Sequence, residues 1–126
     1  MNLDRDHTRL LQILKYTTRI LTDLTKFKNA EELGADYRNV DLLSFWLLQI
    51  AENASNLSDD YRSKHNNLPW RELIRFRSIP AHHYESLNVG VLWNIVTNEV
   101  PILHEFAKQQ EQSKKSRVNS LNVFGK

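Results

Sequence analysis

The sequence has no cysteine, only three glycines and three prolines, and no long apolar run. The absence of cysteine excludes disulfides, a thiolate zinc site and a cysteine nucleophile, and it favours the reducing cytoplasm as the compartment. The longest apolar run, residues 45–48, is far shorter than the roughly 20 residues that a membrane span requires. The N-terminus also lacks the basic patch and apolar stretch of a signal peptide, so neither membrane insertion nor secretion is expected.

A chain of 126 residues with 40% hydrophobic and 25% charged residues is expected to form one globular domain. Its net charge of +2 is unevenly distributed. Residues 112–126 contain four basic and no acidic side chains, which leaves 13 basic and 15 acidic side chains, a net charge of −2, in residues 1–111. We therefore expect a helical domain over residues 1–111 and a flexible basic tail over residues 112–126. The bulk charge does not predict nucleic-acid binding.

The apolar residues recur with the period of an α-helix, which predicts an all-α antiparallel bundle of four to five helices. Helices are expected over residues 3–26 and 40–57, from Pro69 to Ile79, and from Asn88 to about Glu111. Pro69 suits a first helical residue, Asn88 suits an N-cap, and Pro101 should kink the last helix. The connection 29–38 should contain at most one helical turn, and the polar segment 58–67 should end the second helix.

Three apolar faces are predicted to form the core. The face of the first helix comprises Leu3, Leu10, Thr17 and Leu24, with His7, Leu14 and Leu21 in a neighbouring row. The face of the second comprises Val40, Leu43, Leu47, Ile50, Ala54 and Leu57. The face of the last comprises Val89, Leu92, Ile95, Val96, Ile102 and Phe106. The second helix is also apolar at Phe45, Trp46 and Leu48, which is typical of a helix that contacts two other helices or a second subunit.

The segment from Arg77 to Tyr84 combines a permanent cation, two imidazoles and a phenol on either side of Pro80. On a continuous α-helix Arg77 and His82 would face directions about 140° apart, whereas a break at Pro80 would let both side chains turn toward one cleft. Arginine binds a phosphate through two parallel N–H donors, and histidine exchanges a proton near neutral pH. Together they predict metal-independent RNA cleavage, in which a base activates the ribose 2′-OH and a cation stabilises the developing charge. The alternative interpretation is a set of surface groups that bind free carbonyls at a helix end.

The remaining candidates have weaker signals. His83 is expected to have a supporting role, and the two adjacent histidines do not predict a metal site because neighbouring residues rarely direct both rings at one ion. Arg71 and Arg75 share a helical face, which suits either contact with an RNA backbone or a solvated surface. Glu52 is expected either to pair with Arg77 or another cation, or to be exposed. The three tryptophans are expected in the core or in dimer contacts, and no cofactor is expected.

The pattern R-x4-H-x-Y, formed by Arg77, His82 and Tyr84, resembles the signature of HepT-like toxins. These toxins belong to the HEPN superfamily and are encoded beside a minimal nucleotidyltransferase of the MntA kind. The resemblance covers roughly residues 5–108. Besides the motif it includes the lead-in over residues 68–77, the segment 88–101 with Trp93, and the stretch 50–54 around Glu52.

The resemblance implies a HEPN-like helical fold, a homodimer with the motif near the subunit interface, and an endoribonuclease toxin of a type II toxin–antitoxin system. RNA is then the substrate, and Arg77 and His82 are the catalytic residues. It further implies that the partner nucleotidyltransferase, the antitoxin, transfers AMP to Tyr84 and thereby silences the toxin. An AMP group on Tyr84 would place a bulky anion where the RNA phosphate would bind.

Ser78 departs from the pattern of the superfamily, in which an asparagine or aspartate commonly follows the arginine. A serine side chain can form a hydrogen bond but reaches less far, so its supporting role in catalysis is reduced. This departure favours a second hypothesis, a non-catalytic HEPN subunit that binds nucleotide or RNA and docks a nucleotidyltransferase. A third hypothesis is a bundle whose sole role is assembly.

Overall fold

The computed structural model describes residues 2–78 and 88–124, with side chains over residues 5–77 and 88–116. These residues form helices and short connections without a β-strand, so the predicted all-α fold is confirmed. In chain order the elements are α1 (Asn2–Leu24), α2 (Ala30–Gly34), α3 (Tyr37–Ser55), α4 (Asp59–Lys64), α5 (Trp70–Ile74), the 3₁₀-helix η1 (Arg75–Ser78), α6 (Val89–Asn94), the π-helix η3 (Ile95–Glu99) and α7 (Val100–Phe124). No helix in the two described ranges is long and apolar enough to cross a membrane.

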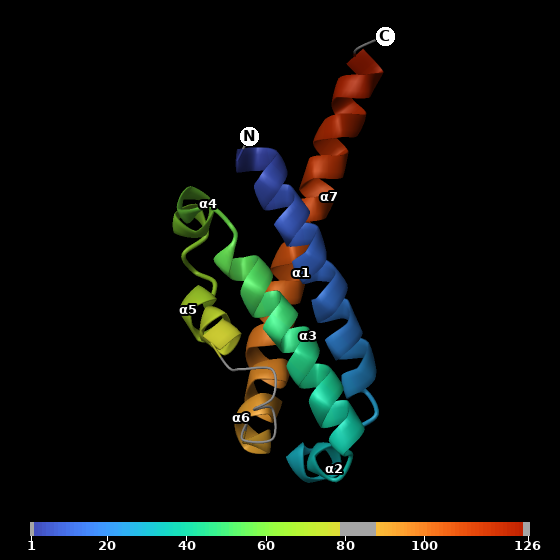
Figure 1. Cartoon of the computed structure of the whole chain (residues 1–126). Helices are drawn as coiled ribbons and strands as arrows, with labels where there is room; N and C mark the ends of the chain where they lie inside the picture. Colours follow the sequence, from blue (N-terminus) through green and yellow to red (C-terminus); the bar gives the residue numbers. More distant parts are fainter. Residues whose placement is uncertain (1, 79–87, 125–126) are drawn as a thin grey trace.

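Three long helices form the centre of the molecule (Figure 1). α1 packs against both α3 and α7 and runs antiparallel to them. α5 and η1 pack on α3, and α2 contacts α6 at the end of the molecule where α1 is connected to α3. The predicted antiparallel arrangement is thus present, and the C-terminal part of α7 extends beyond the N-terminus of α1 (Figure 1).

The predicted core faces of the first two long helices are largely those that the structure buries. On and just after α3 the buried residues are Leu43, Leu47, Ile50, Ala54 and Leu57, and Val40 is partly buried. On α1, Leu10 and Thr17 are buried as predicted. The second buried row of α1 consists of Ile13 and Ile20, which were not predicted to be in the core. The predicted second row is only partly buried at Leu14 and Leu21.

The last helix changes register at η3, and this change corrects the predicted core face beyond it. Regular helical spacing from Leu92 and Val96 placed Ile102 in the core, yet Ile102 is 55% exposed. A π-helical turn inserts one extra residue into the helical repeat, so every later core position moves on by one. The residues buried on α7 are therefore Val100, Leu103 and Ala107.

The same π-helical turn lies directly before Pro101. In a regular α-helix the proline ring would clash with the carbonyl of Thr97, four residues earlier, and one hydrogen bond would be lost. Thr97 belongs to η3, where the wider turn changes this geometry. The helix irregularity expected at the proline is thus present as η3.

The predicted N-cap is also confirmed, since Asn88 Oδ1 accepts hydrogen bonds from the N–H groups of Gly90 at 2.7 Å and Val91 at 3.3 Å.

The C-terminal segment is helical, contrary to the irregular tail expected from the sequence. α7 runs to Phe124, and Lys115 pairs with Glu111 at 3.2 Å, one turn earlier. Such exposed pairs contribute at most about 0.5 kcal/mol, but glutamine, glutamate and lysine are strong helix formers that can extend a helix already begun in the core. The boundary at residue 111 between domain and tail stays a prediction.

The segment 58–67 contains a helix, α4, although its polar sequence predicts only a connection. Ser58 caps α4, with its Oγ accepting a hydrogen bond from the N–H of Tyr61 at 3.1 Å. The carboxylate of Asp6 on α1 is buried and accepts hydrogen bonds from Ser58 N and Ser58 Oγ, both at 2.7 Å. These bonds fix the start of α4 to α1 across 52 residues of sequence.

A histidine–threonine pair connects α7 to α1. Thr17 is completely buried, and its hydroxyl lies 3.0 Å from Nδ1 of His104. Because the Thr17 hydroxyl donates its proton to the carbonyl of Leu14 at 3.1 Å, it must accept a hydrogen bond from a protonated Nδ1. The pKa of His104 is lowered, mainly by burial and further by the charge of Lys108, so the neutral imidazole is the form that the fold favours.

We expect the free energy of unfolding to fall as the pH drops below about 6.5, the ordinary pKa of histidine, through the lower pKa of folded His104. In this window the unfolded chain binds the proton more readily than the folded chain, so acidification favours unfolding. His104→Gln keeps a donor for Thr17 and removes the titration. Urea denaturation at about pH 7.5 and 5.0 should therefore show a smaller loss of stability in the variant, and equal losses in both proteins would refute the role of His104.

Candidate functional site

The segment that leads into the predicted motif changes helix type just before Arg77. α5 ends at Ile74, and the chain continues as the 3₁₀-helix η1 to Ser78. The α-helix predicted to reach Ile79 is therefore shorter than expected and begins at Trp70, with Pro69 as its N-cap. A 3₁₀-helix rotates each residue by about 120° rather than 100°, so the side chains of η1 do not continue the faces of α5.

A buried anchor holds η1 against the bundle. Phe76 is 5% exposed and Leu73 is fully buried, and both α5 and η1 pack on α3. The neighbours of Phe76 in sequence, Arg75 and Arg77, are both exposed. The guanidinium carbon of Arg75 lies 5.7 Å from the centre of the Phe76 ring. Arg77 is thus presented to solvent from a short segment whose position is fixed by a buried aromatic residue.

The structure places only part of the predicted motif. Arg77 is exposed in η1, and Ser78 is the last residue of η1. His82, His83 and Tyr84 fall in residues 79–87, outside the described part of the chain, so their position beside Arg77 stays a prediction. Glu52 is exposed on α3 and forms no ion pair with any described side chain, which agrees with the simpler of its two interpretations.

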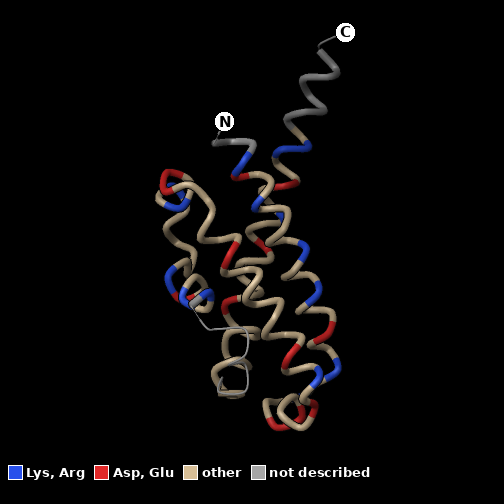
Figure 2. Tube along the Cα trace, viewed as in Figure 1, with Lys and Arg blue, Asp and Glu red and all other residues tan. Residues whose placement is uncertain are grey.

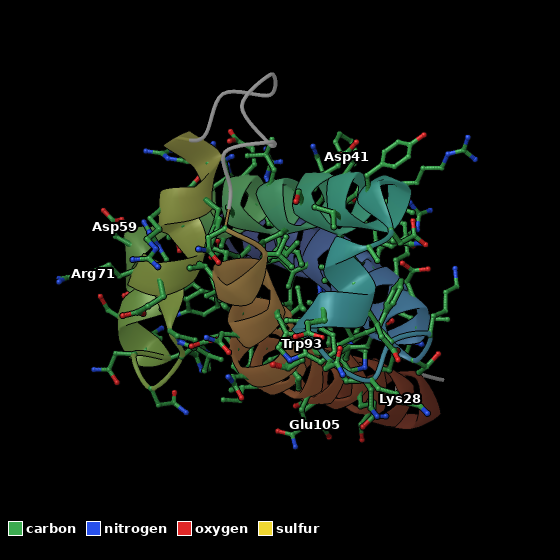
Figure 3. The ribbon with its side chains drawn as sticks, turned by 90° about the horizontal axis from the view of Figure 1, so that it is seen from below. Lys28, Asp41, Asp59, Arg71, Trp93 and Glu105 are labelled. Atoms are coloured by element: carbon green, nitrogen blue, oxygen red, sulfur yellow. The ribbon has the colours of Figure 1, made fainter. Side chains whose placement is uncertain are left out.

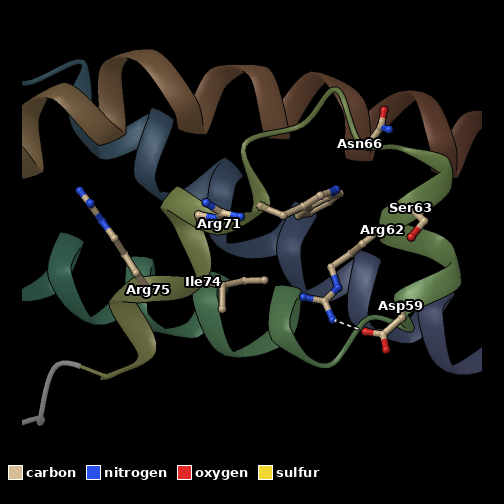
Figure 4. A pocket seen from close by; sticks show the side chains of 8 residues that line it. Asp59, Arg62, Ser63, Asn66, Arg71, Ile74 and Arg75 are labelled. Carbon is tan, nitrogen blue, oxygen red and sulfur yellow. Dashed lines mark hydrogen bonds and ion pairs between the residues drawn. The ribbon is translucent and has the colours of Figure 1, made fainter.

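An open cavity of about 670 Å³ lies between α4 and α5 (Figure 4). α4 and the residues after it contribute Asp59, Arg62, Ser63 and Asn66. α5 and the start of η1 contribute Trp70, Arg71, Ile74 and Arg75. Arg71 and Arg75, which were predicted to contact an RNA backbone, are both exposed and line this cavity. Arg62 and Asn66 were missed because they lie in and just after α4, which is too short to show an apolar period.

Trp70 forms a wall of the cavity rather than an exposed platform. It is 7% exposed, its Nε1 donates a hydrogen bond to the carbonyl of His65 at 2.9 Å, and its ring lies edge-on to Phe106. The expected core role of this tryptophan is confirmed, since the ring is fixed on both sides and presents little surface to a base.

The buried phenol of Tyr61, on α4, does not suit proton transfer at neutral pH. Burial, with a smaller effect of the Asp6 charge, raises the pKa of Tyr61 to about 12, so this phenol stays protonated at neutral pH. Within the described ranges no group of three or more histidine, aspartate and glutamate side chains is placed to hold a metal ion. Near the predicted motif, the exposed arginines of α5 and η1 are suited to contact a phosphate ester.

Comparison with known proteins gives a consistent set of matches. The ribonuclease HepT-like family matches residues 13–110. A protein of Methanocaldococcus jannaschii named "Gamma-glutamylcyclotransferase and putative RNase" is 34% identical over 106 residues, 83% of this chain and 48% of that protein. A "Probable ribonuclease HepT" of Thermococcus cleftensis is 27% identical over 101 residues, 80% of this chain and 92% of that protein. The chain thus spans about half the length of the first relative and nearly all of the second. No solved structure matches it.

Proposed function

Because the chain belongs to the HepT-like ribonuclease family, we propose that it is an endoribonuclease and the toxin of a type II toxin–antitoxin pair. The observation that carries the proposal is the position of Arg77 within the family match. Arg77 is exposed on a 3₁₀ segment that is anchored by Phe76, and a histidine follows five residues later. An exposed guanidinium on a fixed backbone is suited to bind the phosphate of a polymer that approaches from solvent.

The proposed reaction uses the RNA itself as the nucleophile. His82 accepts the proton of a ribose 2′-OH, and the 2′-oxygen attacks the adjacent phosphorus. The bond from phosphorus to the 5′-oxygen of the next nucleotide breaks, and that oxygen takes a proton from a water molecule, to which His82 returns the proton that it accepted. The products are a 2′,3′-cyclic phosphate and a free 5′-OH. Arg77 binds the non-bridging oxygens, on which negative charge increases in the transition state. In this scheme Ser78 and His83 support the site without contacting the reacting atoms.

The proposed regulation acts on Tyr84. A minimal nucleotidyltransferase of the MntA kind would transfer AMP from ATP to the Tyr84 phenol, with pyrophosphate as the leaving group. The modified residue would carry an anion next to Arg77 and His82, where it competes with the RNA phosphate. Loss of RNA cleavage on modification follows from this competition.

A homodimer is proposed through the outer face of α3. Three of the exposed large hydrophobic residues lie on this helix: Tyr37 is 68%, Leu42 is 40% and Phe45 is 44% exposed. Leu42, Phe45 and Glu52 lie on the same face of α3, because their positions follow the helical repeat. Because η1 packs on the same helix, a partner that covers this face would lie near Arg77.

Ser78 favours a second candidate function, a non-catalytic subunit that binds RNA or nucleotide and docks the transferase. The two candidates differ in one assay, incubation of the purified chain with RNA in the presence of a chelator. Cleavage supports the enzyme, and binding without cleavage supports the second candidate. Co-expression with the adjacent transferase, followed by mass spectrometry, should show one or more AMP groups on Tyr84. An unmodified Tyr84 would contradict the proposed regulation under either function.

A further inference from the structure

The cavity between α4 and α5 concentrates positive charge on a body that is otherwise slightly acidic. Its charged lining consists of three arginines and one aspartate, a formal charge of +2, whereas residues 1–111 together carry a net charge of −2. Figure 2 shows the basic positions of this region on α4, α5 and η1. Positive charge collected in a cavity with low-dielectric walls attracts an anion more strongly than the same charge spread over a surface.

The single carboxylate of the cavity is paired on the α4 wall, opposite Arg71 of α5. Asp59 is bound to Nη2 of Arg62 at 2.8 Å, on the same helix, so both partners of this pair belong to the α4 wall (Figure 4). The Asp59 side chain is 97% exposed, and such a solvated pair holds its partner only weakly. Arg71 lies on the opposite wall and is exposed. An incoming phosphate would therefore meet guanidinium groups on two walls.

Arg62 has an unused donor in addition to the pair with Asp59. The side chain of Arg62 is 26% exposed, but its Nε is buried and has no hydrogen-bond partner in the described part of the chain. Because this Nε is not exposed, a ligand in the cavity would contact the exposed part of the Arg62 side chain instead. Ser63 and Asn66 add uncharged hydrogen-bonding groups to the same wall. The α4 wall thus has the donors that phosphate oxygens require.

The cavity is also continuous with the segment that carries the motif. Arg71 and Arg75 are one helical turn apart on α5 and the start of η1, and Arg77 follows two residues later. In Figure 4 the Arg75 side chain lies at the other end of the cavity from Asp59 and extends away from Arg62. An RNA strand that contacts Arg77 could therefore continue along Arg75 and Arg71 into the cavity.

We infer that this cavity binds a phosphate of the RNA strand outside the cleaved linkage, held between Arg62 of α4 and Arg71 of α5. The inference rests on the proposed function for the identity of the ligand, a single-stranded RNA. The contact is with the phosphate, so it strengthens binding of RNA regardless of base sequence. Trp70 takes no part through stacking, because its ring is buried and bound at both ends.

The test uses a short RNA with 2′-O-methyl groups throughout, which the proposed reaction cannot cleave, and measures its affinity by fluorescence anisotropy at several salt concentrations. Arg71→Gln and Arg62→Gln should each weaken binding by about five- to tenfold, and each should reduce the slope of log K against log salt by about 0.7. The matched control is Arg19→Gln, an exposed arginine of α1 that does not line the cavity. If Arg62→Gln fails to fold, as judged by thermal unfolding, Arg71→Gln decides the test.

The outcomes separate the subsite from the proposed enzyme activity. Weaker binding and a reduced salt slope in the cavity variants, relative to Arg19→Gln, support the inference. Affinities and slopes equal to those of Arg19→Gln overturn it, even if the parent chain cleaves RNA. Weaker binding in the variants of a chain that never cleaves RNA supports the subsite and contradicts the enzyme.

Discussion

Replacing Arg77 or His82 with alanine should abolish RNA cleavage while the chain stays folded. Loss of a charge-stabilising group costs about 10²- to 10³-fold in rate, and loss of a general base costs about 10²- to 10⁴-fold. Arg77 is exposed, so Arg77→Ala should change the free energy of unfolding by less than about 0.5 kcal/mol. Cleavage of a labelled RNA and urea denaturation, performed on the same preparations, separate the two effects.

Two matched variants sharpen this prediction. Arg77→Lys keeps the charge but not the two parallel donors, so it should restore only part of the activity. His83→Ala removes the adjacent imidazole, and it should retain most of the activity because His83 only supports the site. Expression of the parent chain should slow growth, and expression of Arg77→Ala should not. Alanine variants that cut RNA as well as the parent would exclude both residues from catalysis.

The largest loss of stability is expected from Asp6→Ala. This variant removes the buried acceptor of two hydrogen bonds at 2.7 Å and leaves the N–H and hydroxyl of Ser58 without it. Bonds to a charged acceptor and buried donors without partners predict a loss of about 2–4 kcal/mol in the free energy of unfolding. The matched control is Asp41→Ala, an exposed aspartate of α3, which should cost less than about 0.5 kcal/mol.

A double-mutant cycle tests the assignment of this effect to α4. Ser58→Ala should cost about 1–2 kcal/mol, because it removes the helix cap and one bond to Asp6. The double variant should be more stable than the sum of the single losses predicts, since both substitutions remove the same contact. Additive losses, or an Asp6→Ala variant as stable as Asp41→Ala, would show that Asp6 does not hold α4. Because α4 carries Arg62, Asp6→Ala should also lower the affinity of the cavity for RNA.

The sequence predicted the elements whose apolar residues follow a regular helical period. α3 is the clearest case, where every predicted core residue from Leu43 to Leu57 is buried. On α1 the period identified the helix but only one of its two core rows, because leucines and isoleucines occupy most of its circumference. The spacing of these apolar residues does not by itself show which of them face α3 and α7. Figure 3, viewed along the bundle, shows how α1, α3 and α7 surround the shared interior.

Errors arose where the backbone leaves the α-helical repeat. Ile102 was placed in the core because a π-helical turn cannot be recognised from apolar spacing alone, although Pro101 signalled an irregularity. α4 was missed because its six residues show no apolar period: Tyr61 is partly buried against the core, and the helix is also held by its cap and by Asp6. The C-terminal part of α7 was missed because it is helical without an apolar face.

The sequence predicted which residues belong to the candidate site but not how they are arranged in space. Arg71, Arg75 and Arg77 were identified from their spacing and their proximity to the motif, and all three are exposed. The cavity was not predicted, since it depends on α4 lying opposite α5 (Figure 3, left, near Asp59 and Arg71). His82, His83 and Tyr84 lie outside the described residues, so their roles are predictions from the sequence and the family.

The most direct test of the central claim is the chemistry of the RNA ends produced by the purified chain in the presence of EDTA. Attack by the 2′-oxygen predicts a 2′,3′-cyclic phosphate on one fragment and a 5′-OH on the other, and it predicts that a single 2′-deoxy substitution at the cut position blocks cleavage there. Fragments with a 3′-OH and a 5′-phosphate, or unchanged cleavage of the 2′-deoxy substrate, would contradict the account.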